Sequence, residues 1–131
     1  MLGEALGLER GDEMKLLSQE RAAYAIECVR GVGEDHDYAR LCRSLPVMLL
    51  QNGLGQSLAF LRSKDGDAHK ALYKDISEWL IGKRRIYAGG GLIEAVMEGG
   101  RDEYMEAQEE ALELSGWLKR FADALIERDE L

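Results

Sequence analysis

Cysteine, proline and long apolar runs are all scarce in this chain of 131 residues. Two cysteines, Cys28 and Cys42, are too few for a disulfide scaffold and lack metal-ligand spacing, so we expect buried, reduced thiols. No apolar run approaches the ~18 residues that a membrane-spanning helix needs. The first residues also lack the basic start, apolar core and cleavage site of an export signal. These absences exclude a disulfide-rich secreted domain and a membrane protein, and they favour a cytoplasmic location.

Basic residues are outnumbered by acidic ones, 17 against 25, which gives a net charge of -8. A chain of this charge is repelled by a phosphate backbone, which opposes broad nonspecific binding of nucleic acid by the isolated chain. Any contact with nucleic acid must therefore come from a local basic patch. Hydrophobic residues make up 46% of the chain, which is too apolar for disorder, and the length fits one domain with a single core.

The apolar residues follow a helical period, and no strand-like alternation bounded by turns occurs. We therefore predict an all-α fold, a single compact bundle of about five to six helices over residues 13–131, preceded by an N-terminal tail over residues 1–12. The clearest element is a long C-terminal helix, because its apolar residues step by three and four. Its predicted inward stripe comprises Tyr104, Ala107, Ala111, Leu114, Leu118, Phe121 and Leu125.

The most apolar stretch, Leu45 to Lys64, contains a polar group around two glycines. Asn52-Gly53 can end one helix, since both residues tolerate the left-handed conformation, and Gly55 allows the next helix to start close by. This pattern predicts a sharp helix-turn-helix corner. Pro46 lies earlier in the same stretch, where its missing N–H is expected to kink or restart the helix.

Arg21 lies on the apolar stripe of a first helix predicted from about Glu13 to Gly31. Two interpretations are open: the guanidinium snorkels or pairs with a carboxylate of another helix, or it points to a charged ligand at an interface. Two aspartates are well placed to cap later helices: Asp37 before the second helix and Asp67 before the helix that precedes Gly82.

No constellation of residues indicates catalysis. Four adjacent residues, Glu34 to Asp37, cannot converge on one metal ion without partners elsewhere, so we expect a solvated loop there. His69 has no nucleophile at a recognisable spacing, and the triple glycine at 89–91 lacks the features of a phosphate-binding loop. We therefore predict no catalytic residue, no metal site and no cofactor.

Basic residues occur in four clusters, each of which is either a solvated helix end or part of a positive face that follows a phosphate backbone. The clusters are Arg40/Arg43, Arg62/Lys64, Lys83 to Arg85, and Lys119/Arg120.

Trp117 stands one residue off the inward stripe of the last helix, either as boundary core or as a contact for a partner.

The corner and part of the last helix carry a family resemblance that covers roughly residues 18–126. The matching segments are Leu45-Pro46-Val47-Met48, Asn52 through Lys64, Gly116-Trp117-Leu118-Lys119-Arg120-Phe121-Ala122, Glu20-Arg21-Ala22, Tyr24-Ala25, Tyr104 and Ala111-Leu112. In these segments the chain resembles the small helical subunit of the type III-B (Cmr, RAMP-module) CRISPR effector complex. The small subunit of the related type III-A (Csm) complex is an alternative within the same system.

The resemblance implies a non-catalytic bundle that stacks in several copies into an inner filament of a ribonucleoprotein and holds target RNA along the guide RNA in antiviral defence. Implied partners are the backbone subunits, the polymerase-like large subunit, further copies of the chain, guide RNA and target RNA, without a membrane or a small-molecule substrate. The residues carried over as RNA-binding candidates are Arg21, Lys64, Lys119 and Arg120. Gln51, Asn52, Gly53 and Gln56 match the corner and are assigned a structural role there.

Two functions of other classes remain as alternatives. One is a self-associating helical adaptor, unrelated to nucleic acid, built on the helix from Tyr104 to Leu125. The other is a metal-dependent nuclease that uses Asp35, His36 and Asp37. The copy number, the face that contacts RNA, and the roles of the cysteines and His36 do not follow from the sequence.

Overall fold

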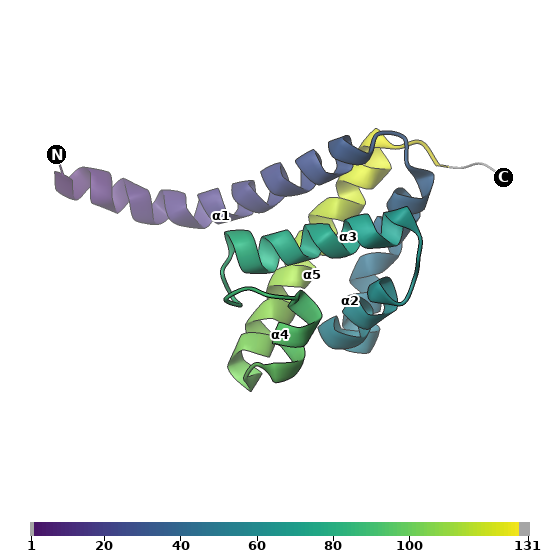
Figure 1. Ribbon diagram of the computed structural model, residues 1–131. Helices are drawn as coiled ribbons and strands as arrows, with labels where there is room; N and C mark the ends of the chain where they lie inside the picture. The colour runs from purple at the N-terminus through teal and green to yellow at the C-terminus, as the bar shows by residue number, and fades with distance from the viewer. Residues whose placement is uncertain (1, 129–131) are drawn as a thin grey trace.

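The computed structural model describes the backbone of residues 2–128 and the side chains of residues 16–128. Within this part of the chain there are five α-helices, one π-helical segment and no β-strand, which confirms the predicted all-α fold (Figure 1). The elements are α1 (Leu2–Val32), α2 (His36–Arg62), α3 (Asp67–Ser77), η1 (Glu78–Lys83), α4 (Leu92–Glu98) and α5 (Arg101–Leu125). Each of these helices is too short or too polar to cross a bilayer.

Helix α1 begins at Leu2, whereas the sequence pattern predicted a tail over residues 1–12 and a helix from about Glu13. The glycines of this segment alternate with Leu, Glu, Ala and Arg, which are good helix formers. Figure 1 shows the N-terminal half of α1 leading away from the other helices. In the described part of α1 the fully buried side chains are Ala25 and Val29. The division into a tail and a domain stays a prediction, because side chains before residue 16 lie outside the described residues.

Helix α2 bends at Gly53, which has φ 82° and ψ 168°, and this confirms the predicted corner. Glycine alone occupies this backbone region without strain. Pro46 lies inside the helix, and Gly53 is the residue of α2 with non-helical dihedral angles, so the chain turns at the glycine and does not restart at the proline. The second arm of α2 then packs Leu54, Leu58 and Leu61 into the core.

The N-cap of α2 lies two residues before the predicted one, and the N-cap of α3 lies one residue before the predicted one. Asp35, not Asp37, caps α2: it has extended dihedral angles, and its side chain accepts a hydrogen bond of 3.0 Å from the backbone N–H of Tyr38. Asp37 already lies in the first helical turn. Gly66 occupies the N-cap of α3, so Asp67 lies in the first turn, where its charge favours the helix dipole.

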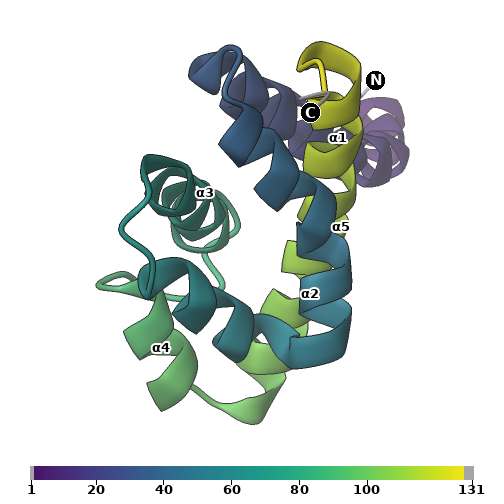
Figure 2. The same cartoon turned by 90° about the vertical axis from the view of Figure 1, so that its right-hand side faces the viewer.

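Helix α5 is the predicted long C-terminal helix, and Figure 2 shows it side by side with α2. Its buried side chains are Ala107, Glu110, Ala111, Leu114, Ser115, Leu118 and Ala122. Leu125, predicted on the inward stripe, is 42% exposed. The reason is that α5 ends there, and Ile126 turns into the core in its place, where it is 2% exposed.

The sequence predicted that the helix after Asp67 ends at Gly82. The segment η1 continues it by one residue, to Lys83. The backbone N–H of Arg84 donates to the carbonyl of Trp79 at 2.8 Å, a spacing of five residues that widens the turn. Trp79 is buried within this wide turn. The bundle thereby brings an indole and a guanidinium from consecutive turns against α5.

Candidate nucleic-acid interface

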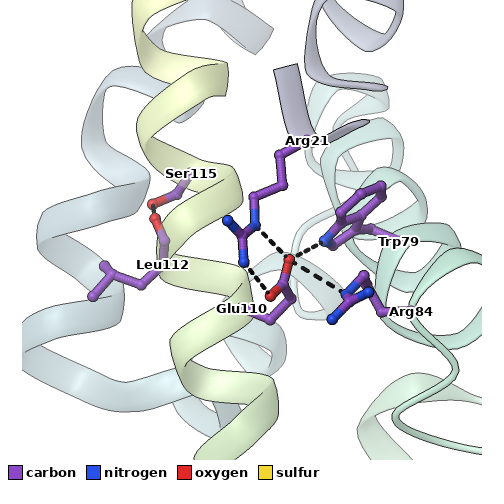
Figure 3. Close-up of polar contacts among 6 residues, drawn as sticks. All are labelled: Arg21, Trp79, Arg84, Glu110, Leu112 and Ser115. Atoms are coloured by element: carbon purple, nitrogen blue, oxygen red, sulfur yellow. Dashed lines mark hydrogen bonds and ion pairs between the residues drawn. The ribbon is translucent and has the colours of Figure 1, made fainter. Parts of the chain in front are cut away.

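A buried carboxylate, Glu110 of α5, joins three elements of the bundle (Figure 3). Arg21 of α1 donates to both of its oxygens, from Nε at 2.8 Å and from an Nη at 2.9 Å. Trp79 donates its Nε1–H to the same carboxylate at 3.0 Å, and Arg84 Nε lies 3.7 Å from it. Since Glu110 is only 6% exposed, this network fixes α1 and η1 against α5.

The network keeps Glu110 ionised. Burial alone would raise the pKa of Glu110, but hydrogen bonds from Arg21 and Trp79 and the charges of Arg21 and Arg84 outweigh it and lower the pKa below its ordinary value. The hydrogen bond to Glu110 in turn raises the pKa of Arg21. Of the two interpretations of Arg21, pairing with a carboxylate of another helix is confirmed. A contact of Arg21 with RNA stays a prediction, and the proposed RNA surface below does not use it.

The corner of α2 is held by two side chains of α5, Tyr104, which the sequence placed on the inward stripe, and Gln108, which the sequence reasoning did not select. Gln108 accepts from the N–H of Leu54 at 2.6 Å and donates to the carbonyl of Leu49 at 2.9 Å. Tyr104 Oη accepts from the N–H of Gly55 at 3.0 Å. Gln108 follows Tyr104 by one helical turn and therefore lies on the same side of α5. A polar residue at that spacing from an inward-facing tyrosine was the sequence signal that could have identified Gln108.

The residues assigned to the corner from the sequence lie on its outer side, except for Gly53. Gln51, Asn52 and Gln56 are exposed. Ser57 donates to the carbonyl of Gly53 at 2.7 Å, so the side chains that hold the corner by hydrogen bonds are those of α5 together with Ser57. The structural role of the three amides stays a prediction.

Two of the four basic clusters come together at one end of the bundle. Lys119 and Arg120 are exposed on the C-terminal half of α5. Arg43 of α2 reaches this part of the chain, since its Nε donates to Asp123 at 2.6 Å and an Nη donates to the carbonyl of Ile126 at 3.2 Å. The first and fourth clusters therefore share one surface, although 80 residues separate Arg43 from Asp123.

The second cluster (Arg62/Lys64) and the third cluster (Lys83 to Arg85) lie away from the surface that carries Lys119 and Arg120. Lys64 is exposed in the connection from α2 to α3, with its ammonium 5.4 Å from the centre of the Phe60 ring. Figures 1 and 2 place this connection on a different side of the bundle from the C-terminal half of α5. Within the third cluster, Arg84 turns inward toward Glu110. Lys64 is therefore not part of the surface that carries Lys119 and Arg120.

The acidic loop proposed for a nuclease has local structural roles. The carboxylate of Asp35 caps α2, and Asp37 pairs with Arg40 on the next turn. Among the described residues, no group of three His, Cys, Asp or Glu side chains could hold a metal ion.

Trp117 is partly buried against the core and stacks on Phe121, with ring centres 5.7 Å apart, as a boundary residue of the core does.

A second polar cluster, around Asp75 of α3, joins α1 and α2. Tyr38 donates its hydroxyl to the Asp75 carboxylate at 2.6 Å, and Tyr24 donates to the Asp75 backbone carbonyl. Burial is the main cause that raises the pKa of Asp75 above its ordinary value. Burial likewise raises the pKa of both Cys28 and Cys42 to about 12. Both cysteines are free thiols as predicted, but only Cys42 is buried, whereas Cys28 is partly exposed. The Asp75 cluster and the two cysteines therefore have structural roles in the packing of α1, α2 and α3.

The Asp75 cluster yields a prediction on stability. Asp75→Asn keeps an acceptor for Tyr38 and removes a charge that burial disfavours, so we expect equal or greater stability at pH 7. Because the folded-state pKa is raised, native Asp75 makes the protein less stable as the pH rises from the unfolded-state pKa through the folded-state pKa, and the asparagine variant should lack this dependence. Urea unfolding at several pH values measures both effects.

Asp75→Ala is the matched variant. It leaves the hydroxyl of Tyr38, which is fully buried, without its acceptor, at an expected cost of about 1–3 kcal/mol. Equal losses from the asparagine and alanine variants would show that the charge of Asp75, and not its role as an acceptor, stabilises the cluster.

Comparison with known proteins gives a consistent result. The family model described as "CRISPR-associated protein (Cas_Cmr5)" matches residues 17–125. A "CRISPR system Cmr subunit Cmr5" of Thermus thermophilus is 38% identical over 117 residues, which cover 87% of this chain and 99% of the relative. Its counterpart of the same name in Thermotoga maritima is 33% identical over 125 residues, with 90% and 91% covered.

The fold also resembles a solved structure. A crystal structure of a CRISPR-associated Cmr5 family protein from Thermus thermophilus superposes with a TM-score of 0.69 at 35% sequence identity. The similarity covers 84% of this chain and 97% of that chain. The bundle described above is therefore similar to that protein over nearly its whole length.

Proposed function

The chain belongs to the Cmr5 family of CRISPR-associated proteins, and on this basis we propose that it is the small subunit of a type III-B CRISPR effector (Cmr) complex. In this proposal the subunit is non-catalytic and stacks in several copies into an inner filament. The filament holds target RNA along the guide RNA in antiviral defence. The observation that carries the proposal is the family match over residues 17–125.

The geometry supports a role in binding and not in bond cleavage. The carboxylate of Glu110, which is 6% exposed, accepts hydrogen bonds from Arg21 and Trp79, and that of Asp35 accepts one from the backbone N–H of Tyr38 at the start of α2. Such fully engaged carboxylates orient helices instead of accepting protons from a substrate. Partners in the proposed complex are its other Cmr subunits, copies of this chain, guide RNA and target RNA.

The net charge of -8 is compatible with RNA binding when it takes place within an assembly. A single copy offers small basic surfaces, such as that of Lys119 with Arg120, and binds a polyanion weakly. Several copies along one strand act at a high effective concentration, so weak contacts add up without new chemistry. Each copy then acts as a spacer and a clamp for the strand.

Charge reversal tests the RNA surface. In the assembled complex, Lys119→Glu with Arg120→Glu is expected to lower the affinity for target RNA about tenfold or more, because every copy then repels the phosphates that it attracted before. Lys64→Glu, on a different side, reports separately on the second predicted contact. Fluorescence anisotropy with a labelled target at several salt concentrations measures both.

A matched control is Lys70→Glu with Lys74→Glu, which makes the same change in net charge on the exposed face of α3. If this control weakens RNA binding as much as the Lys119/Arg120 variant does, the effect comes from net charge. The assignment of Lys119 and Arg120 would then be refuted.

Native mass spectrometry of the tagged protein from its own cells, with and without ribonuclease, tests the function itself. A large assembly that contains a small guide RNA is expected, and its mass gives the copy number. A free monomer or a self-oligomer without RNA would instead support the self-associating adaptor.

A further inference from the structure

Helix α1 borders a continuous groove against α3 and η1 on the surface of the bundle. Figure 1 shows α1 and α3 side by side, and three hollows lie along them. The middle hollow, of about 650 Å³, shares Glu20 with the hollow on one side and Tyr24 and Glu27 with the hollow on the other. We propose that this groove, the α1–η1 groove, binds an amphipathic helix of a different protein subunit. The inference rests on the proposed function, which supplies a complex with further subunits.

The groove has the length and the lining that a helix needs. Its α1 side extends from Leu16 to Val32, which is about 24 Å, or about four turns, at the rise of an α-helix. Leu16 is 47% exposed, and the rings of Tyr24 and Trp79 lie with centres 4.9 Å apart at the middle hollow. Ala23 also lines this hollow, and its small side chain leaves room for those of a partner. A helix that lays its apolar face into such a groove is a common mode of protein recognition.

All but two of the charged side chains that line the groove have a partner within the bundle. The contacts are Glu27 with Arg30 at 3.2 Å, Lys74 with Glu78 at 3.8 Å, Arg84 with Glu110 at 3.7 Å and Asp75 with Tyr38 at 2.6 Å. Glu20 of α1 and Lys83 of η1 are the remaining two, and both are exposed. In the described part of the chain, neither of them forms an ion pair. The groove therefore offers a partner an acidic edge on α1 and a basic edge on η1.

The charges of the groove favour a protein helix over RNA. Glu20 opposes Lys83, and the other charged groups are engaged within the bundle, so the groove does not attract a polyanion. A helix matches both edges when a basic residue beside its apolar stripe meets Glu20 and an acidic residue on the other side of the stripe meets Lys83. Such a helix also covers the exposed side chain of Leu16.

Another copy of this chain fits the groove less well than a different protein does. Val47 and Leu50, which are 51% and 67% exposed, share one face of α2, but they span only about one turn. The long inward stripes of α2 and α5 are buried within their own bundle. An exposed apolar pair of one turn leaves most of a groove of about four turns uncovered. The occupant is therefore a helix of another protein, and the experiment below distinguishes a second copy from it.

Site-specific photocrosslinking in the assembled complex tests the identity of the occupant. The photoreactive amino acid p-benzoylphenylalanine replaces Ala23, which is exposed at the middle hollow, and mass spectrometry identifies the cross-linked peptide. We expect a peptide of a different protein subunit, with apolar residues at steps of three and four. A cross-link to another copy of this chain or to RNA would overturn the inference, and so would the absence of a cross-link in an intact complex.

An exchange of the two edge charges tests the match between groove and helix. Glu20→Lys with Lys83→Glu keeps the net charge and any attraction between these two side chains, but it reverses the charges that a bound helix meets. We expect the full-length variant to bind a synthetic copy of the cross-linked peptide about tenfold more weakly than the wild type, because like charges then face each other. Isothermal titration calorimetry measures both affinities, and thermal unfolding checks that the variant is folded.

The matched control is Lys70→Glu with Glu109→Lys, the same exchange of charge between exposed positions that do not line the groove. This control should bind the peptide as the wild type does. Unchanged affinity of the Glu20/Lys83 variant, or an equal loss in the control, would refute the groove as the binding site. If native mass spectrometry then still finds the complex with its RNA, only the groove assignment falls. If it finds no assembly that contains RNA, the proposed function fails, and the assignment of the partner to the complex fails with it.

Discussion

Glu110→Ala is expected to lower the free energy of unfolding by about 3–5 kcal/mol, because it leaves two buried or half-buried guanidiniums without a carboxylate. Arg21 loses both of its hydrogen bonds to this residue, and Arg84 loses the carboxylate 3.7 Å from its Nε. The buried indole N–H of Trp79 loses its acceptor as well. For a domain of this size, such a loss is a large part of the total stability.

Urea unfolding followed by tryptophan fluorescence measures this loss, with Glu109→Ala as the control. Glu109 is the exposed neighbour on the same helix, and its removal is expected to change stability by no more than about 0.5 kcal/mol. A double replacement, Arg21→Met with Glu110→Leu, removes both charges together and should restore most of the stability. A loss below about 1 kcal/mol from Glu110→Ala would contradict the central role of the network.

The same network predicts a dependence on pH. The folded-state pKa of Glu110 is lowered below its ordinary 4.5, so the unfolded chain takes up its proton first as the pH falls. Its contribution to stability is therefore complete above the unfolded-state pKa and is lost as the pH falls through the folded-state pKa. The Arg21→Met, Glu110→Leu variant should unfold in acid with a smaller dependence on pH than the wild type.

Gly53→Ala is expected to destabilise the protein by about 2–4 kcal/mol, which combines backbone strain of roughly 1–3 kcal/mol with a disturbed hydrogen bond worth about 1 kcal/mol. The glycine has φ 82° and ψ 168°, a conformation that side chains with a Cβ rarely adopt. A Cβ at this position would lie 3.2 Å from the hydroxyl of Tyr104. That hydroxyl accepts the hydrogen bond from Gly55 that holds the second arm of α2.

Gly55→Ala is the matched control, two residues further on. Its Cβ would lie 3.6 Å from the same hydroxyl, which is ordinary contact, and Gly55 is not among the glycines with positive φ. We expect a change within about 1 kcal/mol, because alanine favours a helix more than glycine does. Thermal unfolding of the two variants compares them, and equal losses would show that crowding and not backbone strain makes the corner sensitive.

Local patterns explain which predictions from the sequence were confirmed. In the inward stripe predicted for the last helix, Ala107, Ala111, Leu114 and Leu118 are buried as their spacing predicted. The exceptions lie at helix ends, where one residue decides the geometry. Asp35 caps α2 in place of Asp37, and Leu125 gives way to Ile126, because the exact turn at which a helix starts or stops depends on neighbouring elements.

The sequence by itself determined the all-α class, the inward faces of the helices, the corner at Gly53 and the family resemblance, because each depends on residues within a few turns of one another. Only the tertiary structure decided which charges meet. Arg21 and Glu110 are separated by 89 residues, and Arg43 and Asp123 by 80. Many carboxylates in this acidic chain could have paired with either arginine, and the packing of α1 and α2 on α5 selects one for each. The same packing brings Arg43 of α2 to Asp123 of α5, one helical turn after Lys119 and Arg120, and leaves Lys64 apart from them.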